Sequence, residues 1–489
     1  MKQLQRYGLA GIMALALFLR CLGLNTRGIQ YDDAFSILLA ERSLPDIVRG
    51  TAADTMPPLY YFILHFWLQV SLDLGWLRVL CIILSLGIII CLFLLVKQLF
   101  DHNAALWAAF FAAISPLQYY HAQDIRMYSL LALSQLAYAW FFIRIWKNSG
   151  RTNTWNWVGL VLTGTAGMYS HNLAIFFLII PDVVLVLKRN WRLLAQILVA
   201  QVVIVLVALP WLLQVPGQLE KIQHAFWTPS PGLVEVVQAV VMATTNLPLA
   251  GIWFAAGLIL SVELFVFILL ETIRHKGDGN SRLFLLLLAF LPPVLLFGVS
   301  YLIRPVFVPR GFLTSTLAYL GLAGVIAARK WPKPVAVGIA TSLVMAAAIG
   351  LPVQVSFQEF PRSPFQEAGA FLRDHLVAND VVIHDNKLSY LPMRYYWPDL
   401  PQKFLPDEPG SPNDTFALAS QAAMGIYPES DLKSAIGQSK RVYFVVFQET
   451  IQEYKAAGQD HPQLVSLGKD LHQTALYSFQ DLNIYQFEY

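Results

Sequence analysis

The sequence predicts a polytopic α-helical membrane protein with a small water-exposed α/β domain in its C-terminal part. Of the 489 residues, 56% are hydrophobic and 13% are charged, whereas a water-soluble globular chain carries roughly 25% charged residues. Placing charge in hydrocarbon is costly, which explains the deficit. The mean hydropathy of +0.54 agrees, and long apolar runs dominate positions 1–352.

Eleven apolar runs are predicted to cross the membrane, because a span needs about 20 mostly apolar residues. No small-residue cleavage site follows the first run, so it is predicted to be a retained helix rather than a signal peptide. The run 57–72 is apolar but short, and composition alone does not decide whether it crosses. The predicted spans are 7–24, 77–99, 104–119, 127–146, 156–170, 173–188, 192–214, 250–272, 283–302, 311–328 and 334–352.

Loop charge decides the orientation, because cytoplasmic loops carry an excess of Lys and Arg. If 57–72 stays on the outer side and the N-terminus is cytoplasmic, the basic segments fall inside. Crossing by 57–72 would turn every later basic loop outward. An odd number of spans then places the C-terminal region outside the cell inner (plasma) membrane. The basic segments are 1–6, 97–103, 144–153, 187–192, 271–282 and 328–334.

Two exterior loops are long enough to contain further structure. In the loop 25–76, the segment 32–49 has apolar residues at helical spacing, which predicts an amphipathic helix in the membrane interface. The loop 215–249 is expected to contain a second interfacial helix.

Charged and turn residues return after position 353, which predicts a soluble α/β domain over 353–489 and a transmembrane domain over 1–352. Phe365, Gly369, Leu372 and Leu376 follow one helix face. The segments 380–385 and 441–447 have the apolar, β-branched composition of buried strands. The three cysteines, Cys21, Cys81 and Cys91, all lie in apolar runs, so no disulfide is predicted in this domain.

Acidic side chains stand at two places on the exterior face. Asp32 and Asp33 could supply a general base or bind a cation, or simply stabilise a helix N-terminus. Asp124 and Arg126 lie in the next exterior loop, where the alternative is an ordinary polar turn with an internal ion pair.

Cationic and imidazole side chains stand at two more exterior places. His171 lies in a short turn and could contact a polar ligand, although Ser and Asn beside it also suit a plain turn. Arg304 and Arg310 flank a loop where cations are generally depleted, and arginine geometry suits phosphate. Snorkelling to lipid head groups is the alternative. Together the four clusters favour a negatively charged, lipid-linked substrate.

Two acids lie inside predicted spans. Asp182 and Glu263 are functional candidates because intramembrane acids are costly. The sequence assigns a role to neither, and pairing across helices is the alternative.

Four motifs resemble those of membrane glycosyltransferases with the GT-C fold. The resemblance is to bacterial relatives of dolichyl-phosphate-mannose protein mannosyltransferases (glycosyltransferase family 39) and of aminoarabinose transferase. It covers about 1–352, and departs from the family where Asp33 replaces a Glu and Gly311 displaces an aromatic residue. The motifs are Tyr31-Asp32-Asp33-Ala34-Phe35-Ser36, Pro57-Pro58-Leu59-Tyr60-Tyr61, Gln123-Asp124-Ile125-Arg126-Met127-Tyr128 and Pro305-Val306-Phe307-Val308-Pro309-Arg310-Gly311-Phe312.

The resemblance implies an inverting transfer of one sugar, a hexose or pentose, from a polyprenyl-phosphate donor to an acceptor hydroxyl outside the membrane. It implies Asp32 as general base, with Asp124 assisting. Metal dependence varies within the family, so a divalent ion (Mg, Mn or Zn) on these two acids is one alternative. Arg126, Arg310 and Arg304 would hold the donor phosphate. The implied substrate-binding residues are Asp33, His171, Tyr60, Tyr61 and Tyr128.

Other functions stay open from the sequence. A transporter would have binding sites near the bilayer midplane and repeated halves, and no repeat is visible. A ligase or polymerase that moves whole lipid-linked oligosaccharides could use the same charged face. The partners expected are the donor, membrane lipids and an acceptor on protein, lipid or glycan of the cell envelope, but no nucleic acid.

Overall fold

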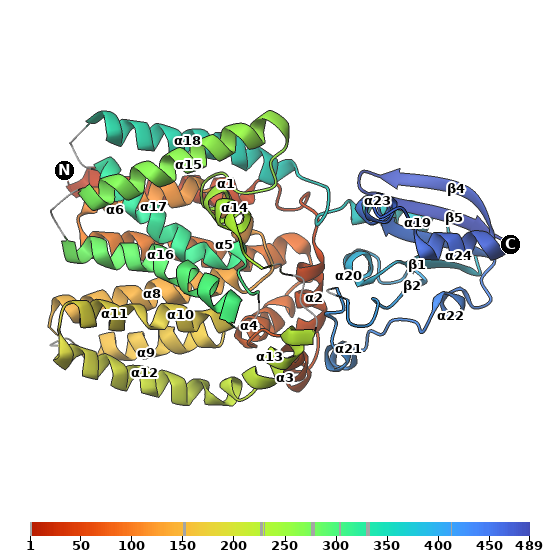
Figure 1. The fold of residues 1–489 in the computed structure, drawn as a ribbon, viewed down its shortest axis with the longest axis horizontal. Helices are drawn as coiled ribbons and strands as arrows, with labels where there is room; N and C mark the ends of the chain where they lie inside the picture. The colour runs from red at the N-terminus through yellow and green to blue at the C-terminus, as the bar shows by residue number, and fades with distance from the viewer. Residues whose placement is uncertain are drawn as a thin grey trace. The chain divides into compact units, whose positions relative to one another are not determined.

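The structure is a computed structural model that describes residues 2–149, 153–224, 228, 230–274, 279–302, 305–328, 333–411 and 413–489. It is mostly helical, with one five-stranded sheet (Figure 1). Its residues form two compact units. The membrane unit consists chiefly of Met1–Leu24, Thr55–Gln223 and Thr228–Val355, and the sheet unit chiefly of Asn25–Asp54 and Ser356–Tyr489.

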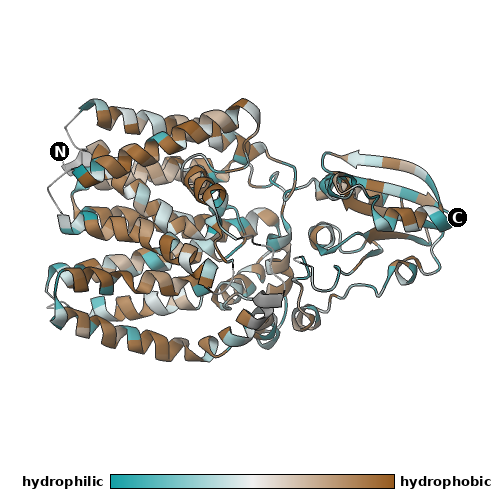
Figure 2. Ribbon diagram, in the orientation of Figure 1, coloured by the Kyte–Doolittle hydropathy of each residue, from teal (hydrophilic) through white to brown (hydrophobic). Residues whose placement is uncertain are grey.

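Among the described residues, seven helical segments are long and apolar enough to cross a membrane. Hydrophobic residues dominate these helices in Figure 2. All seven coincide with predicted spans. They are α5 (Leu74–Leu99), α8 (Tyr128–Lys147), α12 (Trp191–Leu212), α15 (Gly251–Arg274), α16 (Gly279–Leu302), η2 (Pro309–Phe312) with α17 (Leu313–Ala328), and α18 (Lys333–Ser356).

The other four predicted spans coincide with shorter or interrupted helices. Residues 104–119 do not form one helix, because the Ser115 hydroxyl accepts from Gln118 N and begins a new helix with Pro116 at its first position. Residues 173–188 are divided by a break at Ile179. The helices are α1 (Lys2–Cys21), α6 (His102–Ile114) followed by α7 (Pro116–Ala122), α9 (Thr154–Met168), and η1 (Asn172–Ala174) with α10 (Ile175–Leu178) and α11 (Ile180–Leu187).

Three helices of the membrane unit lie in the predicted exterior loops. The run 57–72 forms α4 (Leu59–Leu68), whose ten residues extend about 15 Å, half of the roughly 30 Å hydrocarbon thickness. The α4 helix alone is therefore too short to cross. The loop 215–249 contains α13 (Val215–His224) and α14 (Leu233–Thr244).

The centre of the membrane unit is packed through small side chains. The α6 helix is rich in buried alanine and packs against α17 and α5. A Cβ on Gly324 of α17 would lie 2.6 Å from the Ala108 backbone nitrogen of α6. Small residues allow this close backbone approach, as in many membrane helix interfaces.

A buried arginine closes the C-terminal end of α6. The Arg20 guanidinium donates to Ser85 Oγ at 2.7 Å and to Ala113 O at 2.9 Å. It thereby satisfies a carbonyl of the last helical turn, where intrahelical partners are missing. Gln123 Nε2 in turn donates to Arg20 O at 2.8 Å. This network fixes the segment 115–123, which leads to Asp124.

The sheet unit confirms the predicted α/β region. The strand order is β2-β1-β3-β5-β4. Strands β2, β1 and β3 are parallel, and β5 pairs antiparallel with β3 and β4. Both predicted strands are present. The bounds are β1 (Asp380–His384), β2 (Gln402–Phe404), β3 (Arg441–Phe447), β4 (His472–Phe479) and β5 (Leu482–Glu488).

Helices cover both faces of this sheet. Phe365 and Leu372 of the predicted helix pack with Val382 on one face, and Ile451 and Leu467 pack with the other. The helices of residues 356–489 are α19 (Phe365–His375), α20 (Lys387–Tyr396), α21 (Leu418–Met424), α22 (Leu432–Ile436), α23 (Gln448–Ala456) and α24 (Pro462–Asp470).

The predicted single interfacial helix over 32–49 is wrong. Two helices, α2 (Tyr31–Ala40) and α3 (Leu44–Ala53), occupy the region. Ser43 caps α3 through its hydroxyl, and Pro45 suits only the first turn of a helix. Nearly all of α2 is buried, because it packs against α20 while α3 packs against α21.

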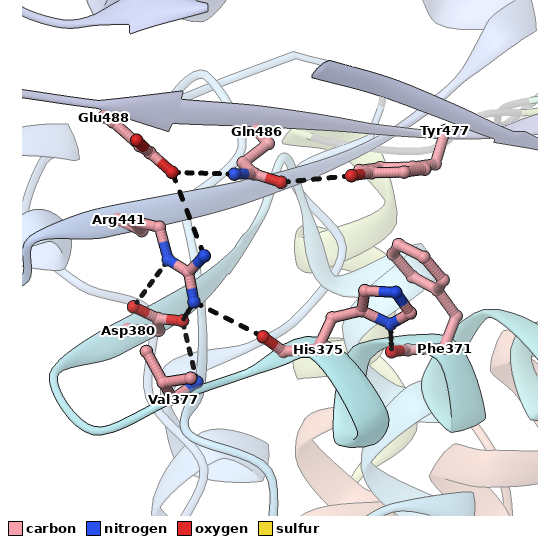
Figure 3. Close-up of polar contacts among 8 residues, drawn as sticks. All are labelled: Phe371, His375, Val377, Asp380, Arg441, Tyr477, Gln486 and Glu488. Atoms are coloured by element: carbon pink, nitrogen blue, oxygen red, sulfur yellow. Dashed lines mark hydrogen bonds and ion pairs between the residues drawn. The ribbon is translucent and has the colours of Figure 1, made fainter. Parts of the chain in front are cut away.

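An ion pair joins the amino ends of the parallel strands (Figure 3). Arg441 donates to both oxygens of the buried Asp380, through Nε at 3.1 Å and Nη2 at 2.7 Å. Its Nη1 lies 3.9 Å from Glu488 of β5. A bidentate pair of this kind fixes geometry as well as contributing energy.

Replacing Arg441 with Met leaves the buried Asp380 carboxylate without its guanidinium. We expect the free energy of opening of β3 to fall by about 3 kcal/mol, as when one partner of a buried pair is removed. Hydrogen exchange at the amides of 441–447, measured on the full chain in detergent, reports this free energy.

Arg49→Met is the matched control. Arg49 and Asp46 form an exposed pair on α3 at 3.2 Å, and exposed pairs contribute about 0–1 kcal/mol. Similar small losses in the free energy of opening in both variants would contradict the conclusion that the Asp380 carboxylate depends on Arg441.

Candidate functional site

The two adjacent acids of α2 have different surroundings. Asp33 is 1% exposed, and its Oδ2 accepts from Gln30 N at 3.1 Å. This is the helix-capping arrangement that the sequence left as an alternative. Asp32 precedes it and is only half-buried. Of the pair, Asp32 is therefore better placed for chemistry.

Asp124 lies in a buried polar segment between α7 and α8. Its Oδ2 is 3.4 Å from His121 Nδ1, and both side chains are almost fully buried. The His121 carbonyl accepts from Ser129 Oγ at 2.8 Å. His121 is not among the site residues that the sequence predicts, although its position three residues before Asp124 at a helix end is a usable signal.

Two tyrosines of α4 support this segment. Arg126 Nη1 donates to Tyr61 Oη at 3.2 Å. Tyr60 Oη lies 3.4 Å from Cys81 Sγ, which donates to the Asp124 carbonyl at 3.1 Å. Tyr60 and Tyr61 are fully buried, so α4 holds both charged residues in place. Nothing in the sequence marks Cys81 as part of the site, because it lies in an ordinary apolar run.

The Tyr128 ring brings three charged or polar side chains together. Its centroid lies 5.2 Å from the His121 ring and 5.7 Å from the His171 ring. The Arg310 guanidinium lies 6.0 Å from the same ring, within the range of a cation–π contact. Residues from three distant parts of the chain thus share one site.

His171 stabilises its own turn and also presents a hydrogen-bond donor. Its Nδ1 accepts from Leu173 N at 3.1 Å, so this geometry assigns the proton of the neutral imidazole to Nε2. Burial, and then the charges of Arg126 and Arg310, lower the pKa of His171 to about 3. At neutral pH the ring is therefore an uncharged Nε2–H donor beside two arginines.

An apolar cavity of about 330 Å³ lies between α14, α15, α16 and α17. Its wall includes Phe307 and Phe312, which flank Arg310 in the chain. The same segment therefore offers a cation and an apolar surface. Such a combination suits a ligand with an anionic head and a hydrocarbon tail.

Not every predicted residue joins this cluster. Arg304 lies outside the described residues. Asp32 and Asp33 belong to the sheet unit, and the other described candidates belong to the membrane unit. Asp182 is near Gln201 on α12, and Glu263 is exposed on α15.

Within the described ranges, no group of three or more His, Cys, Asp or Glu side chains is arranged to hold a metal ion. His121 and Asp124 supply two such ligands, fewer than the three protein ligands of a typical catalytic zinc site. The described residues therefore fit a metal ion only in part.

Residues 55–213 match the family model described as dolichyl-phosphate-mannose-protein mannosyltransferase. This segment contains Tyr60, Tyr61, Asp124, Arg126 and His171. No curated protein sequence matches the chain.

Solved structures share the fold at low sequence identity. ArnT from Cupriavidus metallidurans in the apo state is 13% identical, with a TM-score of 0.64 over 98% of this chain and 97% of that chain. The same protein bound to undecaprenyl phosphate is 11% identical, with the same TM-score and coverage.

A larger archaeal enzyme is also similar. The oligosaccharyltransferase AglB from Archaeoglobus fulgidus, in complex with an inhibitory peptide and a dolichol-phosphate, is 12% identical. Its TM-score is 0.55 over 98% of this chain and 74% of that chain. The predicted resemblance to GT-C membrane glycosyltransferases is thereby confirmed: residues 55–213 match the dolichyl-phosphate-mannose-protein mannosyltransferase model, and the chain shares its fold with ArnT.

Proposed function

We propose that this protein is an inverting glycosyltransferase that moves a single sugar from a polyprenyl-phosphate donor to an acceptor hydroxyl outside the membrane. The observation that carries the proposal is the apolar cavity whose walls, Phe307 and Phe312, flank Arg310. The family match over 55–213 and the shared fold support it. The related ArnT structure contains undecaprenyl phosphate, a lipid of this class.

The topology belongs to the same proposal. Eleven helical segments cross the inner membrane, the N-terminus is cytoplasmic, and α4 stays on the outer side. Residues 353–489, together with segment 25–54 of the same compact unit, are then extracytoplasmic, and the rest of 1–352 forms the transmembrane domain. The length of α4 supports this arrangement, because ten residues span about 15 Å. The basic loops then face the cytoplasm, as the positive-inside rule requires.

The donor binds with its isoprenoid chain in the apolar cavity and its phosphate toward Arg310 and Arg126. Arg304 lies six residues before Arg310 and adds a third cation to the same anion. His171 donates from Nε2 without adding charge. Positive charge and fixed donors stabilise a phosphate leaving group in surroundings where water is scarce.

The transfer is a single displacement. The acceptor hydroxyl oxygen attacks the anomeric carbon, the bond from that carbon to the phosphate oxygen breaks, and polyprenyl phosphate leaves. Asp32 takes the hydroxyl proton as general base. Its half-buried position on α2 supports this role over Asp33, whose carboxylate caps the helix.

The other residues predicted for the site assist this transfer. Asp124, paired with His121, assists by orienting the acceptor. Tyr128 lines the sugar site, Tyr60 and Tyr61 support it by holding the segment of Asp124 and Arg126, and Asp33 contributes by fixing the start of α2.

Transfer of a whole oligosaccharide is a second candidate function. The fold shared with the archaeal oligosaccharyltransferase favours it. Mass spectrometry of the cell envelope from a deletion strain discriminates the two, because loss of one sugar residue supports the first function and loss of an entire oligosaccharide supports the second.

Arg310→Gln is expected to weaken binding of undecaprenyl phosphate by about 10- to 100-fold, the loss that follows removal of a hydrogen bond to a charged group. Calorimetric titration of the purified full chain in detergent measures the affinity. Arg144→Gln is the control, because Arg144 stacks on Trp140 at the other end of α8. Equal affinities for Arg310→Gln and wild type would exclude Arg310 from the phosphate site.

Asp32→Asn is expected to abolish sugar transfer, because an amide cannot take the hydroxyl proton. Binding of undecaprenyl phosphate should be unchanged. Mass spectrometry of the envelope in a complemented deletion strain measures transfer. Asp46→Asn, at a partly exposed acid of α3 in the same loop, should transfer normally. A normal envelope glycan with Asp32→Asn would refute the base assignment.

His171→Asn is expected to lower affinity for undecaprenyl phosphate about tenfold, because Asn keeps an acceptor for Leu173 N and loses the Nε2 donor. With a pKa near 3, His171 stays neutral from pH 5 to 8, so wild type and variant should differ by a constant factor there. The unfolded imidazole binds protons at about pH 6.5. Stability should therefore fall as pH decreases from 6.5 toward 3. Affinities that converge near pH 6 would contradict the neutral donor.

A further inference from the structure

The helix that carries Asp32 folds with residues from the far end of the chain. Segment 25–54 belongs to the same compact unit as Ser356–Tyr489. The α2 helix packs against α20, and α3 packs against α21 (Figure 1). The Phe35 ring meets Phe416 edge-on at 6.3 Å. The larger packing contacts of α2 thus lie within its own unit.

Direct contacts fix the segment just before α2. Ile29 N donates to Tyr396 Oη of α20 at 3.3 Å, across 367 residues of sequence. A Cβ on Gly28 would lie 2.9 Å from Arg362 O, so the two backbones approach as closely as glycine permits. Both contacts lie within four residues of Asp32.

The end of α3 is fixed by a similar contact. Ser420 Oγ of α21 donates to Gly50 O at 3.0 Å, and a Cβ on Gly50 would lie 3.3 Å from Ala423 Cβ. The segment is therefore attached on both sides of Asp32, by hydrogen bonds as well as by apolar packing.

We infer that the C-terminal part of the sheet unit positions the general base, and that Tyr396 is a positioning residue for the reaction. The inference rests on the proposed role of Asp32. Tyr396 fixes the Ile29 amide, and the next amide, Gln30 N, is held by Asp33. Two consecutive amides are thus bound where α2 begins. A displacement of about 1 Å at a base can lower a rate by about 100-fold, so this attachment bears on catalysis.

Tyr396→Phe tests the inference in the full-length protein. It removes one hydroxyl and keeps the ring. We expect hydrogen exchange in peptides covering 28–40 to be about fivefold faster, the ratio for loss of one ordinary hydrogen bond. We also expect slower appearance of the modified envelope glycan after induction in a deletion strain. Affinity for undecaprenyl phosphate should be unchanged.

Tyr477→Phe is the matched control. Tyr477 Oη also makes a 3.3 Å contact, with Gln486 Oε1 in the same unit (Figure 3), but it does not touch segment 25–54. It should leave exchange in 28–40 and glycan appearance as in wild type.

Unchanged exchange in 28–40, or unchanged glycan appearance, with Tyr396→Phe would overturn the inference. Reduced undecaprenyl phosphate affinity would also overturn it, because the effect would not be confined to the base. Full activity of Asp32→Asn would instead refute the base assignment, and the exchange result would distinguish the two failures.

Discussion

The high cost of an unsatisfied polar group in hydrocarbon governs this structure. Arg20 is fully buried, and the described acceptors of its guanidinium are carbonyls of α1 and α6 and the Ser85 hydroxyl. Its guanidinium supplies donors to carbonyls that α6 leaves exposed by ending early. The early end of α6 is set by Ser115 and Pro116. A local sequence signal thus creates the polar interior that holds Asp124.

The same constraint explains why the site is built from paired side chains. His121 with Asp124, and Tyr61 with Arg126, each satisfy a buried charge. His171 remains neutral because charge there would face both burial and two arginines. Two arginines and a neutral imidazole donor are thus near one another, a combination whose chemistry suits an anion.

Sequence patterns predicted the regular elements well, because hydrophobic period and composition are local. The strands at 380–384 and 441–447 and the seven long helices follow from them. The division of 32–49 was missed, although Ser43 and Pro45 mark it. The packing of α2 against α20 could not be predicted, because no local sequence pattern indicates a contact between residues as distant as Ile29 and Tyr396.

The site shows the same limit. The motifs around Asp124 and Arg310 are visible in the sequence, but their meeting at Tyr128 depends on tertiary packing. The different surroundings of Asp32 and Asp33 follow from burial rather than residue type, since both are aspartates. One carboxylate is held by Gln30 N and starts the helix. That hydrogen bond fixes the first turn of α2, so the Asp32 carboxylate also has a defined position. A general base must first lie within reach of the proton that it takes, and only then does its pKa matter.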